Sequence, residues 1–89
     1  MKIQPHLAEA IAEVIEILRK EKGMTKSSLA DFACLERRYL REIEQRTKKQ
    51  TVNAVYSICE ALQVHPLEFF QRVTAEMEKL KGKCDGKSK

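Results

Sequence analysis

The chain has 89 residues, which is enough for one domain and too few for two. Its content of 43% hydrophobic and 34% charged residues is typical of a folded, charge-rich domain and argues against a disordered chain. The formal net charge of +4 permits nucleic-acid binding but does not require it, so the arrangement of the charges has to decide.

The cysteines and histidines do not form a recognisable chemical site. Cys34, Cys59 and Cys84 contain no C-x-x-C pair, and the two histidines lie far apart, so we expect no disulfide framework, no metal site and no cofactor. No Ser-His-Asp, Cys-His or phosphate-loop arrangement is visible, and we therefore expect that the protein is not an enzyme. Because the chain shows neither a signal peptide nor a run of about 18 apolar residues, we expect a cytoplasmic protein without a membrane span.

Apolar residues recur at three- and four-residue steps along most of the chain, and this spacing predicts an all-α fold. Pro5 suits the first position of a helix and Gly23 its end, while Thr25 and Thr51 suit N-cap positions. The expected helices cover about residues 5–22, 25–33, 36–45, 51–62 and 66–80 of one domain, residues 1–80. Residues 81–89 are rich in lysine, and we expect them to form a basic disordered tail.

The second and third expected helices, residues 25–33 and 36–45, have the length and rhythm of a helix-turn-helix. The third packs through Leu40 and Ile43, so its polar side must face outward. A helix of this width fits the major groove of B-DNA, and the first residues of the second helix of the motif reach base edges. Arg37 and Arg38 hold those positions, and arginine can donate two hydrogen bonds to guanine.

Other polar side chains around this motif suit contact with DNA. Glu42 either accepts a hydrogen bond from cytosine N4 or pairs with Arg38 one helical turn away. Lys26 and Ser27 begin the first helix of the motif, where a helix N-terminus favours a phosphate. The residues predicted to contact double-stranded DNA on this basis are Lys26, Ser27, Arg37, Arg38, Arg41, Glu42, Arg46, Lys48 and Lys49.

The stretch from about residue 11 to residue 70 resembles the lambda/434-repressor-like, or XRE, family of helix-turn-helix transcription regulators. The family's Leu-Ala, Ile-Glu, Ala-Leu, Val and acidic-Leu positions are matched by Leu29-Ala30, Ile43-Glu44, Ala61-Leu62, Val64 and Glu68-Phe69. The resemblance implies a compact five-helix bundle in which Arg37, Arg38, Arg41 and Glu42 face the DNA groove.

The resemblance also assigns three further roles. Lys26 and Tyr39 match positions that often touch the DNA backbone, although Tyr39 suits core packing equally well. Arg19 and Glu44 match a structural ion pair that links the recognition helix to the first helix of the chain.

The chain departs from the family pattern at its turns. Cys34 stands where the family usually has glycine between the two helices, and Arg46 stands where glycine usually follows the recognition helix. A left-handed conformation costs a residue other than glycine roughly 1–2 kcal/mol, so these turns either relax or carry strain. Ser28 replaces the usual Glu, and Glu36 replaces a small cap and brings to the DNA surface a negative charge that should weaken binding.

The apolar stripe of the last helix exceeds what the minimal fold needs, and it is either additional core or a dimer contact. We expect a homodimer that uses Phe70, Val73, Met77 and Leu80. The resulting hypothesis is a dimeric transcription regulator that reads a palindromic operator, such as a phage-type repressor, a restriction-modification controller or an antitoxin. The alternative is a protein-interaction module on the same fold, which binds a partner through its C-terminal helix and DNA weakly or not at all.

Overall fold

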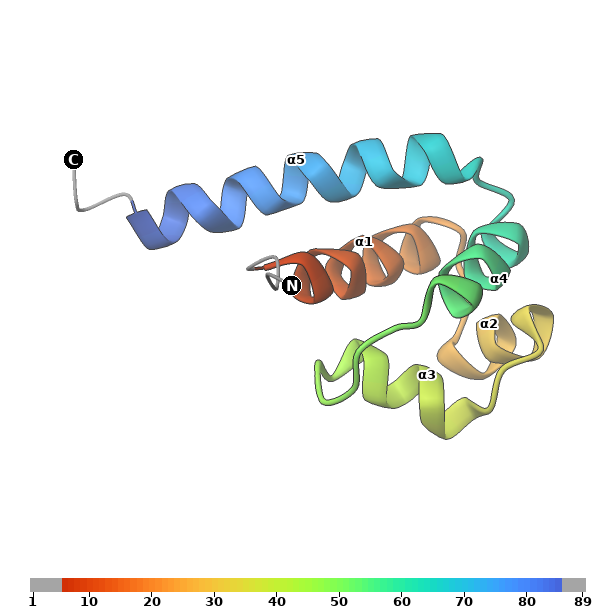
Figure 1. Ribbon diagram of the computed structural model, residues 1–89. Coiled ribbons are helices and arrows are strands. Elements are labelled where there is room, and N and C mark those ends of the chain that lie inside the picture. Colours follow the sequence, from red (N-terminus) through yellow and green to blue (C-terminus); the bar gives the residue numbers. More distant parts are fainter. Residues whose placement is uncertain (1–5, 86–89) are drawn as a thin grey trace.

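The computed structural model describes residues 6–85, and the side chains as far as residue 81, and it contains five α-helices in that part of the chain (Figure 1). These are α1 (Leu7–Glu21), α2 (Lys26–Ala33), α3 (Arg37–Glu44), α4 (Val52–Leu62) and α5 (Pro66–Asp85). The all-α architecture predicted from the spacing of apolar residues is confirmed. None of the described helices is long and apolar enough to cross a bilayer.

The first four helices begin and end within two residues of the predicted positions. The last helix does not end at residue 80, because α5 continues through Asp85. Residues 81–85 are therefore helical, and the expectation of a disordered tail is wrong for them. Extending an existing helix adds one hydrogen bond per residue and lysine is a good helix former, so α5 continues in spite of Gly82. The predicted N-terminal Pro5 and the last residues of the predicted tail, 86–89, lie outside the described residues.

Two threonines cap the helices that they precede, as predicted. Thr25 Oγ1 accepts a hydrogen bond from the backbone N–H of Ser28 at 3.0 Å, and Thr51 Oγ1 accepts one from that of Ala54 at 3.0 Å. Each bond satisfies an N–H group that has no partner within the helix, and such a cap contributes about 1 kcal/mol. The caps therefore fix where α2 and α4 begin.

Helices α1 to α4 are each followed by a residue in the left-handed conformation, with φ of 69° at Gly23, 58° at Cys34, 62° at Arg46 and 59° at Gln63. The residue that follows each of these donates a backbone hydrogen bond of 2.8–3.0 Å into the last turn, which is the Schellman motif. Of the two alternatives for the turns at Cys34 and Arg46, strain is therefore the correct one, because both residues adopt the glycine-like conformation.

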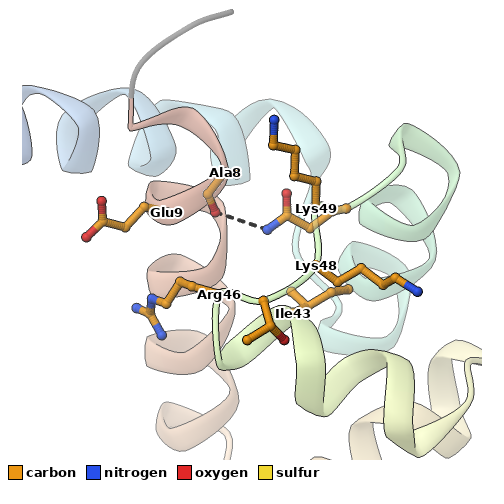
Figure 2. Close-up of a pocket in the computed structure, with 8 residues that line it drawn as sticks. Ala8, Glu9, Ile43, Arg46, Lys48 and Lys49 are labelled. Atoms are coloured by element: carbon orange, nitrogen blue, oxygen red, sulfur yellow. Dashed lines mark hydrogen bonds between the residues drawn. The ribbon is translucent and has the colours of Figure 1, made fainter.

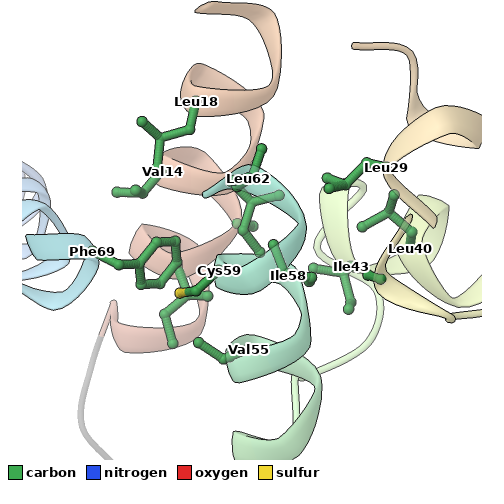
Figure 3. Close-up of a cluster of buried hydrophobic side chains, with 14 of the residues drawn as sticks. Val14, Leu18, Leu29, Leu40, Ile43, Val55, Ile58, Cys59, Leu62 and Phe69 are labelled. Atoms are coloured by element: carbon green, nitrogen blue, oxygen red, sulfur yellow. The ribbon is translucent and has the colours of Figure 1, made fainter. Parts of the chain in front are cut away.

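The hydrophobic core surrounds α4 (Figure 3). Helix α1 packs along α5, and α2 packs on the other side of α4 (Figure 1). The side chains that are fully or almost fully buried come from all five helices, and they include Ile15, Leu29, Leu40, Ile43, Ile58, Cys59, Leu62 and Phe69. This core holds α2 and α3 as a unit against α1 and α4.

The apolar stripe of α5 is mainly additional core. Val73 is only 1% exposed, so the prediction that it contacts a second copy is wrong, because α5 lies along α1 and buries it within the monomer. Met77 and Leu80 are partly buried against the same core. Among the four predicted dimer residues, only Phe70, at 36% exposure, is an exposed side chain.

Candidate nucleic-acid interface

Helix α3 has one buried side and one side open to solvent. Leu40 and Ile43 are fully buried, as their spacing predicted. Arg37, Arg38 and Arg41 are exposed, which leaves three guanidinium groups along two turns of the outer side of the helix. Helix α3 begins without a side-chain cap, because the side chain of Glu36 makes no capping hydrogen bond.

Ion pairs organise two of these three arginines. Arg37 Nη2 lies 3.5 Å from Asp31 Oδ2 of α2, across the turn of the motif. Arg38 Nε lies 3.3 Å from Glu42 Oε2, so the sequence alternative in which these two residues pair is observed. Arg41 makes no ion pair within the described part of the chain. All three arginines sit on a helix that is short, rigidly packed and exposed on this side.

The basic loop after α3 adds Lys48 to the same surface, next to Tyr39 of α3. Lys48 Nζ lies 3.8 Å from Glu42 Oε1 and 5.9 Å from the centre of the Tyr39 ring. The Tyr39 hydroxyl accepts a hydrogen bond of 3.3 Å from the backbone N–H of Thr51, and its ring packs against the core. Tyr39 thus ties α3 to the start of α4 while its hydroxyl remains at the surface.

Arg46 is turned away from this surface. Its Nη2 atom donates to Glu13 Oε1 of α1 at 2.6 Å, its Nη1 atom lies 3.6 Å from Glu16 Oε1, and Nη1 also donates to the carbonyl of Glu44. Figure 2 shows the Arg46 side chain directed towards α1, whereas Lys48 extends the other way. The pKa of Glu16 is lowered by its hydrogen bond from Lys20 and, to a smaller degree, by Arg46.

A second contact ties the loop to α1. Gln50 Nε2 donates to the carbonyl of Ala8 at 3.0 Å, next to a hollow of about 490 Å³ between the loop and the start of α1 (Figure 2).

Three further residues predicted to contact DNA are exposed. Lys49, on the same loop, makes no ion pair within residues 6–81. Lys26 and Ser27 are exposed at the start of α2, on the helix that Thr25 caps.

A buried ion pair fixes α3 to α1. Arg19 donates from Nε to Glu44 Oε2 at 2.9 Å and from Nη2 to Glu44 Oε1 at 3.2 Å, and the two residues are 8% and 4% exposed. The two-bond geometry sets the orientation as well as the distance between the helices. It is the pair that the family resemblance implied.

A helix-turn-helix family model matches residues 15–69 of the chain, and the match includes α2, the turn and α3. The chain belongs to the XRE-type helix-turn-helix family. Members of this family are DNA-binding transcription regulators. No cluster of His, Cys, Asp or Glu in the described part of this XRE-type protein is suited to hold a metal ion.

Solved structures of a restriction-modification controller protein share this architecture. The wild-type controller C.Esp1396I is 31% identical, with a TM-score of 0.78 over 83% of this chain and 95% of that one. Its tetramer in complex with the natural 35-base-pair operator gives 31% identity and a TM-score of 0.78, over 83% and 97% of the two chains. The structure of the same protein bound to a 25-base-pair operator site has 31% sequence identity and a TM-score of 0.77, over 83% of this chain and 97% of that one. No curated protein sequence matches the chain significantly.

Sequence reasoning placed the arginines of α3 correctly on the surface of this XRE-type domain but missed three features. The contact of Arg46 with α1 depends on carboxylates distant in sequence, and the sequence carries no signal for it. The pair between Asp31 and Arg37 spans the turn, where helical spacing no longer applies. The exposed apolar residues Phe32, Tyr56 and Leu67 were not singled out. Val52 was expected to belong to the apolar stripe of the fourth helix, but it is 73% exposed and lies on the same side of α4 as Tyr56, one turn away.

Proposed function

We propose that this XRE-type protein binds a palindromic operator as a homodimer, with α3 of each copy in the major groove of double-stranded DNA. The observation that carries the proposal is the outer side of α3, where Arg37, Arg38 and Arg41 are exposed while Leu40 and Ile43 are buried. Arg37 and Arg38 lie in the first turn, from which side chains reach base edges in this motif. Arg41, free of ion pairs among residues 6–81, reads a base or a phosphate one turn further along.

The side chains around α3 position the protein on the DNA backbone. Lys26 and Ser27 meet a phosphate at the start of α2, where the helix dipole adds to the attraction. Lys48 and Lys49 neutralise phosphates beyond the end of α3, and the Tyr39 hydroxyl, which accepts a bond from the protein, keeps its hydrogen to donate to a phosphate. Arg46 is not part of this set, because its guanidinium is held by α1.

A second copy of the chain covers the exposed apolar side chains of α4 and of the first turns of α5. Val52 and Tyr56 are 73% and 53% exposed one turn apart on α4, and Leu67 and Phe70 are 66% and 36% exposed one turn apart on α5. Helices α4 and α5 are consecutive and contact each other. An association of two copies supports the binding of two half-sites about 34 Å apart, one helical turn of DNA.

Among regulators of this type, the comparison favours a restriction-modification controller. The supporting observation is that C.Esp1396I, a controller solved as a tetramer on its operator, is 31% identical over nearly all of its own length. We further propose that the protein acts as a regulator and not as an enzyme, and that it acts in the cytoplasm, where its operator is accessible.

A selection from random duplex DNA at physiological salt tests the proposal. The wild-type protein should enrich a palindromic motif, and the Arg37→Ala/Arg38→Ala variant should lose it. The variant Lys79→Ala/Lys81→Ala removes the same charge from exposed positions of α5 and should enrich the wild-type motif. A wild-type protein that enriches no motif, but retains a protein partner in a pull-down through α5, would instead be an interaction module.

A further inference from the structure

Glu42 lies between two cations that come from different parts of the fold. Its Oε2 atom is 3.3 Å from Arg38 Nε of α3, and its Oε1 atom is 3.8 Å from Lys48 Nζ of the following loop. The Glu42 side chain is 28% exposed, whereas those of Arg38 and Lys48 are 79% and 56% exposed. The carboxylate is therefore recessed, and the two cations approach it from outside.

The three side chains line one hollow on the proposed DNA-binding surface. This hollow, of about 380 Å³, is bordered by Glu36, Arg38, Tyr39, Glu42 and Lys48. A carboxylate with one cation at each oxygen imitates a DNA phosphate, whose two free oxygens attract arginine and lysine in the same manner. In the free protein, Glu42 thus engages Arg38 and Lys48 as a phosphate would.

This arrangement affects non-specific DNA binding most. Binding to any sequence comes from cations that neutralise phosphates and release counterions. For Arg38 or Lys48 to do this, each must leave Glu42, and the uncompensated carboxylate then lies beside the phosphates. Non-specific DNA offers Glu42 nothing in return, because its bases are not engaged.

We propose that Glu42 is a specificity-determining residue: it withholds Arg38 and Lys48 from the phosphates of non-specific DNA and releases them only at the operator. This inference rests on the proposed function. At the operator, an amino group on a base edge, such as N4 of cytosine, donates to the freed carboxylate in the major groove. Glu42 then pairs with Arg38 in the free protein and contacts a base in the complex with the operator.

Glu36 provides a matched control within the same hollow. It carries the same charge and is exposed, but it makes no ion pair with any described residue and no capping hydrogen bond. A change of Glu36 to Gln alters the net charge of the surface as Glu42→Gln does, without releasing Arg38 or Lys48. Any difference between the two variants therefore comes from the ion pairs of Glu42.

The experiment measures the affinity of wild type, Glu42→Gln and Glu36→Gln for the selected operator and for a random duplex of equal length, over a range of KCl. We expect Glu42→Gln to bind the random duplex about tenfold more tightly near 0.1 M salt, with a salt slope steeper by about 1–2, as one or two phosphate contacts are added. Its operator affinity should change much less, so its specificity ratio falls. Glu36→Gln should affect both duplexes by a similar, smaller factor.

Two results would overturn the inference, and they are distinguishable. If the wild type discriminates between the duplexes and Glu42→Gln discriminates equally well, with a salt slope like that of Glu36→Gln, the inference fails while the proposed function stands. If the wild type shows no salt-dependent DNA binding, the proposed function fails and the inference fails with it.

Discussion

Arg46 Nη2 lies 2.6 Å from Glu13 Oε1, and this contact joins the loop after α3 to the middle of α1. Arg46 therefore stabilises the packing of the loop against α1, whereas Lys48 and Lys49 of the same loop are exposed to solvent. The contact fixes the loop from which both lysines extend. The structural cation of this loop and the two lysines that we propose to bind DNA can therefore be separated by mutation.

We expect Arg46→Ala to lower the free energy of unfolding by about 1 kcal/mol, since partly exposed ion pairs contribute little more than this. The same change should leave the salt slope of DNA binding unaltered. Lys49→Ala should leave the stability within about 0.5 kcal/mol and reduce the salt slope by about 1. Urea unfolding and DNA titrations at several salt concentrations measure both quantities. A reduced salt slope in Arg46→Ala at unchanged stability would show that Arg46 reaches a phosphate after all.

The buried pair of Arg19 and Glu44 leads to a larger effect. We expect Glu44→Ala to destabilise the protein by about 3–5 kcal/mol, because it leaves the Arg19 guanidinium buried without a carboxylate. The hydrogen bond from Arg19 Nη1 to the carbonyl of Met24, at 2.8 Å, would keep that charge in place instead of letting it turn to solvent. Urea denaturation measures the loss.

A double variant separates the cost of burying an unpaired charge from the value of the pair. Arg19→Met/Glu44→Leu replaces both partners by apolar side chains of similar size, and such replacements are often neutral or stabilising. We expect it to recover most of the stability that Glu44→Ala loses. If the double variant is as unstable as the single one, the pair contributes net stability and the prediction is wrong.

The turn of the helix-turn-helix carries strain that glycine relieves. Cys34 has a φ of 58°, which costs a residue with a Cβ atom roughly 1–2 kcal/mol, while glycine costs about 0.4–1 kcal/mol through the entropy of the unfolded chain. We therefore expect Cys34→Gly to stabilise the protein by about 0.5–1 kcal/mol, measured by thermal or urea unfolding. The geometry of the turn, and with it DNA binding, should remain.

Gly23 gives the reverse test at the end of α1. Its φ is 69°, and a Cβ atom added there would meet no atom within 4 Å, so only the backbone conformation opposes a side chain. Gly23→Ala should destabilise by about as much as Cys34→Gly stabilises. Equal stabilities for Cys34→Gly and wild type would mean that the thiol makes a compensating contact in the folded state.

The positions that the sequence predicts well are those governed by local periodicity. Leu40 and Ile43, three residues apart, determine which side of α3 is buried, and so the outward position of Arg38 and Arg41 followed directly. Local periodicity does not predict which other residue an apolar or charged side chain contacts. The spacing of Val73 shows that it faces an apolar surface, but not that this surface is α1 of the same chain.

The proposed dimer surface predicts a change in molecular mass. We expect Leu67→Lys to weaken self-association strongly, because the residue is 66% exposed and a buried unpaired ammonium at an interface is costly. The fold should be unaffected, since Leu67 is outside the core of the monomer. Sedimentation over a range of concentrations measures the association. A mass unchanged from that of wild type would exclude this side of α5 as the interface.

The thiols differ in exposure and should differ in reactivity. Cys34 is exposed, whereas Cys59 is buried in α4, and burial raises the pKa of the Cys59 thiol to about 11. The thiolate is the reactive form, so at pH 8 the folded protein should be labelled rapidly at Cys34 and not at Cys59. A Cys84→Ser background removes the third thiol, and labelling is followed by absorbance with an aromatic disulfide reagent. Urea provides the control. Cys59 should react only as fast as the domain unfolds, so moderate urea should accelerate its labelling steeply and that of Cys34 little.

Rapid labelling of Cys59 in native buffer would show that α4 opens locally, and would contradict the packing of the core around it.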